Sequence, residues 1–397
     1  MLTNKTVIII GASVTGLSAA IALNQKGFDV TIFERHSSNQ TIGAGIVLWS
    51  NASFILAKLG LLEAIKKVSG KPDNMKRLSV TNDVLGTLNI DIINKEIGFD
   101  SYSILRKDLQ GVLLDELSNK GVKINYNSPI VDIVSLENKA YIVFENGLKY
   151  TADIIVGADG RMASQARKYV LGENTSSYQS FINWIGIYKS KKKLFTSMDI
   201  LDYWGVGERF GIVPIDTYTC YWAGGIFSKT IEPKEPLKYK NELLDIFKKY
   251  PPIVAKVIEE SLLESVNKIY LHDHNPKSCW HKDNVIMLGD AAHAALPTSG
   301  QGSAQALEDA WHFANILFEN STNIELAFKK FTQMRYRKTT AIIETGRNLA
   351  MSIFNNDENY CYHRNEASKK IDFSILAKGM AKGWREGLKD ENIVTYR

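Results

Sequence analysis

Gly11-Ala12-Ser13-Val14-Thr15-Gly16 is the stretch that decides the fold class. It follows a short apolar run at residues 6–10 and opens a segment, residues 17–23, in which apolar side chains recur at helical spacing. A second apolar run comes at residues 30–33. These segments predict a strand, a turn, a helix and a second strand, the βαβ unit of an α/β fold. Such a turn directs backbone N–H groups and the positive end of the helix toward a pyrophosphate.

Two features of this unit indicate a cofactor site. Gly11 and Gly16 occupy the outer glycines of a GxGxxG pattern, whereas Ser13 stands at the middle position, where it either tolerates a close phosphate or hydrogen-bonds one of its oxygens. Glu34 ends the second strand, 18 residues after Gly16, where a carboxylate accepts hydrogen bonds from a ribose. A carboxylate favours an unphosphorylated ribose, as in FAD or NAD. Arg35 follows and is assigned to the same site.

Two further segments lead from a predicted strand into a polar turn. Residues 153–160 read Asp-Ile-Ile-Val-Gly-Ala-Asp-Gly, which alone also fits an ordinary tight turn. Residues 289–293 read Gly-Asp-Ala-Ala-His, so that a strand delivers Asp290 to a turn. Gly300 and Gly302 let the backbone approach a ligand, and a helix that begins just after them directs its N-terminus to the same place.

The composition is that of a globular protein. The 397 residues suffice for two domains, and 45% of them are hydrophobic and 23% charged. The formal charge of +5 is scattered, which indicates no nucleic-acid surface but suits an anionic substrate or a phosphate-bearing cofactor. Cys220, Cys279 and Cys361 lie far apart, and we expect reduced thiols.

The chain offers no membrane span and no metal site. No apolar run is long enough to cross a bilayer, and the first residues lead directly into a strand without room for a signal peptide. We therefore expect a soluble, cytoplasmic protein. His272 and His274 flank Asp273, but this triplet without a further ligand does not predict a metal site.

In this order the motifs resemble those of the class A flavoprotein monooxygenases, the para-hydroxybenzoate hydroxylase family. The resemblance covers residues 5–345 and rests on GxSxxG at residue 11, Glu34, GADGxxxSxxR at residue 157 and GDAAHxxxPxxGQG at residue 289. It implies bound FAD, NAD(P)H as reductant, and hydroxylation of an aromatic substrate with O2 through a flavin hydroperoxide.

The resemblance also implies roles for single residues. The first motif holds the ADP part of FAD, Asp159 serves FAD and the nicotinamide cofactor, and Asp290 holds the flavin ribityl and pyrophosphate groups. Arg106, at the start of a predicted helix, matches an arginine near the flavin phosphates. Residues 43–46, Gly-Ala-Gly-Ile, match a segment near the isoalloxazine that includes Gly45.

Within the family, the chain is most similar to hydroxylases of small aromatic or heteroaromatic acids, such as the urate hydroxylases and the salicylate hydroxylase-like members. Residues 183–186 and 205–209 match these enzymes in order and spacing. This resemblance implies that Arg209 and Tyr221 contact the substrate.

The residues themselves allow a second interpretation of Arg209. Alternation along its predicted strand puts Arg209 on one face with Gly211 and Val213, an apolar setting in which a cation needs a partner. The alternative is an arginine at the rim of the sheet, paired with Glu208 or Asp216.

The order of elements predicts two interleaved domains. We expect an FAD-binding, three-layer Rossmann-like domain from residues 1–75, 102–175 and 268–345, an antiparallel-sheet substrate domain from residues 76–101 and 176–267, and a C-terminal helical segment from residues 346–397. Residues 243–261 read as helix.

Three alternative functions stay open. In the first, the protein is a monooxygenase whose substrate is a larger polycyclic compound, such as a tetracycline-type antibiotic. In the second, it is a flavin dehydrogenase or reductase that transfers no oxygen. The third alternative is a flavin-bound module that binds a protein partner through residues 355–359, Asn-Asn-Asp-Glu-Asn. We expect a monomer or a homodimer.

Overall fold

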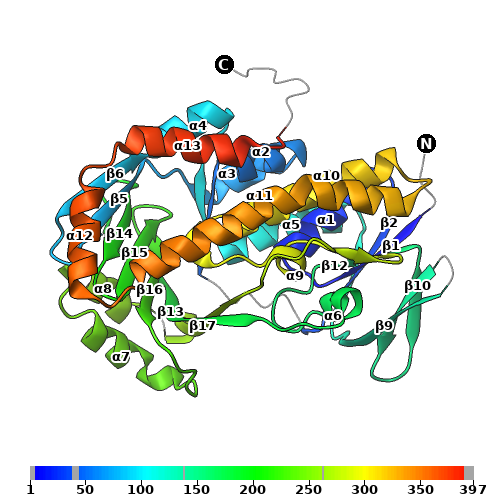
Figure 1. Cartoon of the computed structure of the whole chain (residues 1–397), viewed down its shortest axis with the longest axis horizontal. Helices are drawn as coiled ribbons and strands as arrows, with labels where there is room; N and C mark the ends of the chain where they lie inside the picture. The colour runs from blue at the N-terminus through cyan, green and yellow to red at the C-terminus, as the bar shows by residue number, and fades with distance from the viewer. Residues whose placement is uncertain (1–4, 38–43, 137–138, 262, 389–397) are drawn as a thin grey trace.

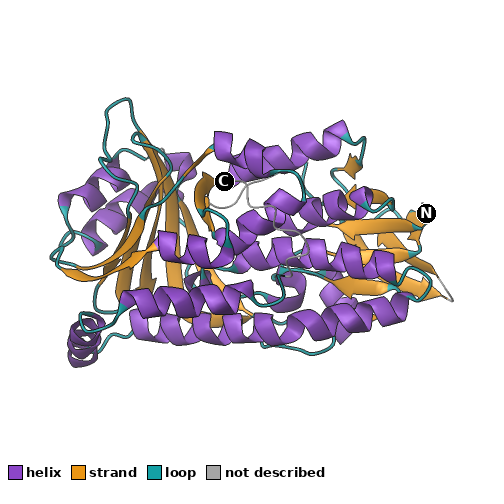
Figure 2. Ribbon diagram, turned by 90° about the horizontal axis from the view of Figure 1, so that it is seen from above, coloured by secondary structure: helices purple, strands orange, loops and turns teal. Residues whose placement is uncertain are grey.

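The computed structural model describes residues 5–37, 44–136, 139–261 and 263–388. Two large sheets stand at opposite ends of the molecule, and long helices run between them (Figures 1 and 2). The predicted α/β class is confirmed. None of the helices in these ranges is both long and apolar enough to cross a membrane.

The first sheet has six strands and is parallel except at its edge strand β18. Its order is β18 (His281–Lys282), β19 (Val285–Met287), β12 (Ile154–Gly157), β1 (Thr6–Ile10), β2 (Asp29–Phe33) and β8 (Lys123–Asn125). Strands with nearly continuous apolar sequence, such as β1, are typical of parallel sheets buried on both faces.

Helices and a small sheet cover this first sheet. Helix α1 (Val14–Gln25) packs on β1 and β2 and against α5 (Arg106–Asn119) and α10 (Gly302–Glu319). A three-stranded sheet of β9 (Ile130–Leu136), β10 (Lys139–Phe144) and β11 (Lys149–Ala152) packs against the central strands, where Phe33 meets Phe144 and Tyr150. Helix α6 (Gln165–Leu171) contacts β12, β19 and β9.

The second large sheet has seven strands. Its order is β17 (Asn267–Asp273), β13 (Ser177–Lys189), β16 (Thr219–Phe227), β15 (Glu208–Pro214), β14 (Ile200–Trp204), β5 (Asn74–Ser79) and β6 (Val84–Asn89). The pairs are antiparallel except β5–β14, which is parallel. Strand β17 belongs to this sheet, so the crossing to the first sheet comes after residue 273 and not at the residue 268 expected from sequence.

Alternation along the strands divides this sheet into two different faces. Trp184, Tyr203, Phe210 and Trp222 point to one face and pack with α7 (Tyr239–Ile246) and α8 (Pro252–Glu259). The helical character expected over residues 243–261 is thus divided between two helices. Pro252, at the first position of α8, cannot continue the preceding helix, because proline lacks an N–H and clashes with the previous turn.

A third group of elements lies between the two sheets. It comprises the strands β3 (Gly45–Leu48), β4 (Ser69–Gly70) and β7 (Tyr102–Leu105), the helices α2 (Ser50–Lys58), α3 (Leu62–Lys67), α4 (Ile90–Ile97) and α9 (Asp290–His293), and the 3-10 turn η3 (Pro297–Ser299). Two further 3-10 turns accompany the seven-stranded sheet: η1 (Pro236–Lys238) leads into α7, and η2 (Leu263–Ser265) contacts β13.

Helix α11 (Ile324–Ile353) ties the two sheets together, and Figure 1 shows it running from one to the other. Near its C-terminus, Arg347 forms an ion pair with Asp273 of β17 (2.6 Å), and Phe354 stacks on Phe181 of β13. Helices α12 (Glu358–Ser368) and α13 (Phe373–Arg385) follow, and α13 packs on α4 and β6.

A buried network of charges joins α11 to α10. Arg335 (1% exposed) donates to Glu308 Oε2 (2.5 Å) and Asp309 Oδ1 (2.7 Å). Burial alone would raise the pKa of both carboxyls, but Arg335 and neighbouring cations hold both below their ordinary values. His293 Nε2 lies 2.5 Å from Asp309 Oδ2, so this histidine is a structural partner of α10. The network places the turn after β19 relative to α10.

His312, one turn farther along α10, makes a prediction about acid stability. Burial, with Arg335 next in importance, lowers the pKa of His312 from 6.5 to about 4. Between these two pKa values, His312 is protonated in the unfolded chain but neutral in the folded chain. The free energy of unfolding therefore decreases as pH falls from the unfolded pKa to the folded pKa. This shift corresponds to about 3 kcal/mol.

We expect the free energy of unfolding to fall in both proteins when pH is lowered from about 7.5 to about 4.5. The fall should be about 3 kcal/mol smaller in His312→Phe than in wild type, because the variant has no imidazole to protonate. Urea denaturation at both pH values measures this. The exposed His363 offers the control His363→Phe. Parallel acid losses in wild type and His312→Phe would contradict the assignment.

Candidate active site

The three motifs meet where β1, β12 and β19 end. These strands are neighbours in the order β19-β12-β1 and run parallel, so their turns open at one edge of the sheet. Parallel sheets bind ligands at the carboxyl ends of their strands. This edge carries Gly11, Asp159 and Asp290.

The first turn is packed too closely for residues other than glycine. Gly11 has a φ of 100°, and a Cβ on it would stand 2.6 Å from the carbonyl oxygen of Ala158. A Cβ on Gly16 would stand 1.9 Å from the carbonyl oxygen of Gly11. Ser13 caps α1: its hydroxyl accepts the Gly16 N–H (3.4 Å) and donates to the Ala158 carbonyl (3.0 Å). The hydroxyl thus joins the first two motifs, and its contact with a phosphate stays a prediction.

Glu34 holds the same turn from the end of β2. Its carboxylate accepts the N–H groups of Ala12 (2.8 Å) and His36 (3.0 Å), and the residue is 9% exposed. Arg35 Nε lies 3.2 Å from His36 Nε2. Glu34 and Arg35 both line the pocket at this edge. The contact of Glu34 with a ribose stays a prediction.

The second motif is bonded to its own helix and to the third motif. Asp159 accepts the Ser164 hydroxyl (2.6 Å) and the Gln165 N–H (2.7 Å) at the start of α6. Burial raises the pKa of the Asp159 carboxyl, although these hydrogen bonds oppose the shift. Arg167 donates to the carbonyl oxygen of Ala291 in the third motif (2.9 Å). The two turns therefore hold a fixed relative position.

Asp290 has a cationic partner in the second motif. Arg161 Nη2 lies 2.6 Å from Asp290 Oδ2. Burial alone would raise the pKa of Asp290, but the charge of Arg161 and its hydrogen bond hold it below its ordinary value. Reasoning from sequence missed Arg161, although its place directly after Gly160 of the motif was a signal.

Arg106 brings a further cation to the same edge, where the charge of Asp290 partly offsets the effect of burial on its guanidinium. Its backbone N–H donates to the Ala44 carbonyl (3.2 Å), which ties the start of α5 to the segment that leads into β3. Burial lowers the pKa of its guanidinium. Within the described ranges, no ion pair joins this guanidinium to a carboxylate. Gly43, next to Ala44, lies outside those ranges.

The loop after the third motif leads into a long helix. Gly300 ends η3 with a φ of 63°, and Gly302 begins the 18-residue α10. A Cβ on Gly302 would meet no heavy atom within 4 Å, so the backbone is open to a ligand there. Gln301 between them is buried. The first N–H groups of α10 have no partner within the helix and suit an anion.

A cavity of about 510 Å³ runs along this edge. Of the residues expected to bind a cofactor, it is lined by Gly11, Ser13, Glu34, Arg35, Arg106 and Asp159. Gly16 lies behind the turn, and Asp290, Gly300, Gly302 and Gly45 lie outside the lining of this cavity. Six of the eleven residues that the sequence assigned to the cofactor therefore line this cavity, and five do not.

Tyr221 reaches from the seven-stranded sheet to the small sheet of β3. A Cβ on Gly45 would stand 2.0 Å from a carbon of the Tyr221 ring, so only glycine allows this contact. Burial raises the pKa of the Tyr221 hydroxyl, with Arg209 opposing the shift. The hydroxyl is therefore protonated and available as a donor at neutral pH.

Arg209 has a different partner from those considered in the sequence. Its Nε lies 2.6 Å from Oδ1 of Asp202, which is buried in the neighbouring strand β14. The pairing with Glu208 or Asp216 is therefore wrong. Glu208 is adjacent in sequence and points to the opposite face, whereas Asp202 shares the face of Arg209. No motif marks Asp202, since only strand pairing brings it there.

Between Arg209 and Tyr221 the sheet has a floor of small residues. Gly211 pairs with Ala223 on this face, and a Cβ on Gly211 would meet no atom closer than 3.9 Å. Val213 pairs with Tyr221 at one side. A planar molecule resting on this floor would have a cation at one end and a hydroxyl at the other.

A family model for the FAD binding domain matches residues 4–323 of the chain. The chain belongs to this FAD-binding family. It is 28% identical over 339 residues to the FAD-dependent urate hydroxylase of Mycolicibacterium vanbaalenii, with 85% of this chain and 86% of the relative covered. It is 25% identical to the 6-hydroxynicotinate 3-monooxygenase of Pseudomonas fluorescens over 379 residues, 89% and 93% of the two chains.

The crystal structure of Klebsiella pneumoniae HpxO complexed with FAD and uric acid has the same fold. It superposes with a TM-score of 0.89 at 22% identity, over 98% of each chain. These findings confirm the resemblance to the class A flavoprotein monooxygenases and confirm FAD as the cofactor. The groups at the strand ends fit FAD, because they combine the N-terminus of α1, the guanidinium of Arg106 and the Glu34 carboxylate next to a glycine turn.

Arg106→Met should separate FAD binding from folding. Burial lowers the pKa of this guanidinium, so its charge costs free energy in the FAD-free protein, and its removal should leave the melting temperature unchanged or raise it. If the guanidinium meets a phosphate, its loss costs about 1.5–3 kcal/mol, or ten- to a hundredfold in FAD affinity. Flavin fluorescence titration and thermal melting of FAD-free protein measure the two effects.

Arg167→Met is the matched control, because its guanidinium bonds backbone carbonyls of the third motif. It should lower the melting temperature of the FAD-free protein. The role assigned to Arg106 fails if its variant melts like Arg167→Met and binds FAD like wild type.

Proposed function

We propose that the protein uses FAD, NAD(P)H and O2 to hydroxylate a small aromatic or heteroaromatic substrate that is an anion or ionises readily. The observation that carries this proposal is the placement of Arg209 and Tyr221 at two ends of a small-residue floor, with Tyr221 against Gly45. The names of the relatives, which are a urate hydroxylase and a 6-hydroxynicotinate monooxygenase, support it.

The FAD, when bound and reduced by NAD(P)H, supplies the activation of O2 and the transfer of one oxygen atom. The chain's own residues bind and orient. We assign Gly11, Ser13 and Gly16 to the pyrophosphate, Glu34 and Arg35 to the adenosine side, and Arg106 and Asp159 to the phosphates. We assign Asp290, Gly300, Gly302 and Gly45 to the flavin side.

Arg209 and Tyr221 divide the work on the substrate. The guanidinium attracts an anionic group and stabilises negative charge on the ring, which makes the ring more electron-rich. Asp202 accepts from Arg209 Nε on one oxygen and from the Trp204 indole on the other (2.9 Å), so the direction of the guanidinium is fixed. Tyr221, held protonated by burial, donates a hydrogen bond to the substrate.

The function is tested by measuring NAD(P)H consumption with phenolic acids, purines, hydroxypyridine acids and polycyclic phenols, together with product mass. We expect slow consumption without substrate and fast consumption with a small acid, because substrate-gated reduction avoids wasting reductant. The product should gain one oxygen atom from O2. Stimulation without oxygen incorporation would indicate a dehydrogenase, and stimulation by polycyclic phenols alone would indicate a larger substrate.

Arg209→Gln should keep its FAD but weaken substrate binding about ten- to a hundredfold, as expected for the loss of a charge-assisted hydrogen bond. It should also divert NAD(P)H electrons to hydrogen peroxide. Asp202→Asn should shift coupling in the same direction, and Tyr221→Phe should act more weakly, since it loses one neutral hydroxyl. Product and peroxide formed per NAD(P)H consumed measure these effects.

Lys189→Gln provides a control. Lys189 also lies on the seven-stranded sheet, but it is exposed at the end of β13. This variant should remain coupled. If Arg209→Gln is as well coupled as Lys189→Gln and binds substrate normally, Arg209 is a structural residue.

A further inference from the structure

The end of the C-terminal helix reaches the loop of Gly300. The rings of Trp384 in α13 and Trp49 lie 5.1 Å apart at 45°. The indole Nε1 of Trp49 lies 3.2 Å from the place of a Cβ on Gly300. An aromatic pair thus extends from the last turn of α13 to the glycine that precedes α10.

A second path, made of hydrogen bonds, starts at the same end of α13. Lys338 of α11 donates to the carbonyl oxygens of Trp384 (2.6 Å) and Glu386 (2.8 Å). The same ammonium donates to both oxygens of Glu308 (3.0 and 2.8 Å). Lys338 is 6% exposed, and burial lowers its pKa, so its charge depends on these acceptors.

The path continues from Glu308 into the loop itself. Asn51 Nδ2 donates to Glu308 Oε1 (2.8 Å) and to Gln301 Oε1 (2.9 Å). Gln301 stands between Gly300 and Gly302 and is 1% exposed. Its side-chain nitrogen has no hydrogen-bond partner among the described residues, so the side chain is held through its oxygen.

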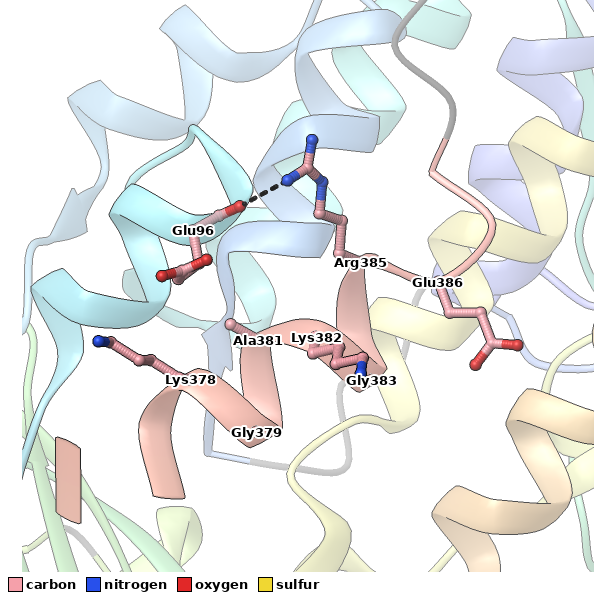
Figure 3. Close-up of a pocket in the computed structure, with 8 residues that line it drawn as sticks. All are labelled: Glu96, Lys378, Gly379, Ala381, Lys382, Gly383, Arg385 and Glu386. Atoms are coloured by element: carbon pink, nitrogen blue, oxygen red, sulfur yellow. Dashed lines mark hydrogen bonds between the residues drawn. The ribbon is translucent and has the colours of Figure 1, made fainter. Parts of the chain in front are cut away.

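Helix α13 packs on α4 and β6, and its last turn makes the contacts with Trp49 and Lys338. Ala377, Ala381 and Trp384 are buried in it, and Trp384 has the largest of these three side chains. A hollow of about 810 Å³ lies along α13 and is also lined by Glu96 of α4, and Figure 3 shows Lys378 and Lys382 beside it. Arg385 bridges to the Glu96 carbonyl of α4 (3.3 Å). The last turn of α13 is therefore the part of this helix that is connected to the loop of Gly300.

We infer that residues 384–386 form part of the flavin site, with Trp384 and Lys338 as positioning residues for the loop 300–302. Both paths converge on this loop, one through Trp49 and one through Glu308 and Asn51. Binding of FAD at the loop and docking of the end of α13 therefore strengthen one another. Such coupling is reciprocal and typically amounts to about 5–150-fold in affinity.

The first measurement uses the wild-type chain with and without FAD. Hydrogen exchange of peptides covering residues 373–388 should slow at least fivefold when FAD binds, although these residues lie outside the lining of the cavity along the strand ends. Peptides from α7, which packs on the far face of the seven-stranded sheet, should not change. Equal exchange of residues 373–388 in both forms would overturn the inference.

The second measurement is FAD affinity by fluorescence titration of full-length variants. Trp384→Ala should weaken FAD binding at least fivefold, and Trp384→Phe should restore most of it because the ring contact with Trp49 persists. The exposed Ile375 on the same helix gives the control Ile375→Ala, which should bind FAD like wild type. FAD affinity of Trp384→Ala within twofold of wild type would overturn the inference, and if this variant does not fold, the hydrogen-exchange comparison decides.

Discussion

The ends of β1, β12 and β19 approach one another so closely that side chains are excluded from several positions. A Cβ on Gly11 would collide with Ala158, and one on Gly289 would stand 2.3 Å from the hydroxyl of Thr15. Because the three turns touch, the Ser13 hydroxyl and the Arg167 guanidinium can bond from one turn to the next. The close contact among these three turns therefore fixes the relative positions of Gly11, Asp159 and Asp290.

Behind the turns, the position of α10 is set by buried charges. Two carboxylates, Glu308 and Asp309, are fully buried and are compensated by Arg335, Lys338 and the bond to His293. Buried ion pairs often contribute little net stability because desolvation offsets their attraction, but they tolerate few alternative arrangements. We interpret the network as fixing the orientation of α10 relative to the third motif. Asp309 also accepts the Gly289 N–H (2.8 Å), which holds the start of the GDAAH turn.

The two faces of the seven-stranded sheet differ in role: one packs against helices, and the other bears the residues that we assign to the substrate. One face is filled with aromatic side chains and covered by α7 and α8. The other face keeps small residues at Gly211 and Ala223 and places Asp202 beside Arg209. Polar groups are therefore grouped beside an open floor on one face only, and this supports the proposed division between a cofactor side and a substrate side.

Much of the cofactor side could be predicted from sequence, because its physical requirements are local. A tight turn needs Gly11 and Gly16, a strand end presents Glu34, and a strand-turn unit presents Asp159 and Asp290. Each signal lies within a few residues of the chain. The α/β class follows equally from apolar periodicity over short windows.

The remaining features arise from contacts between residues far apart in the chain. The partner of Arg209 is Asp202 because β14 and β15 pair in one register, and that register decides which side chains share a face. Tyr221 meets Gly45, and Trp384 meets Trp49, only after the sheets and α11 have brought distant segments together. The sequence by itself determined the fold class and the chemistry of the turns, since these depend on neighbouring residues; the tertiary structure alone decided the ion pairs and aromatic contacts, since these depend on strand register and helix packing.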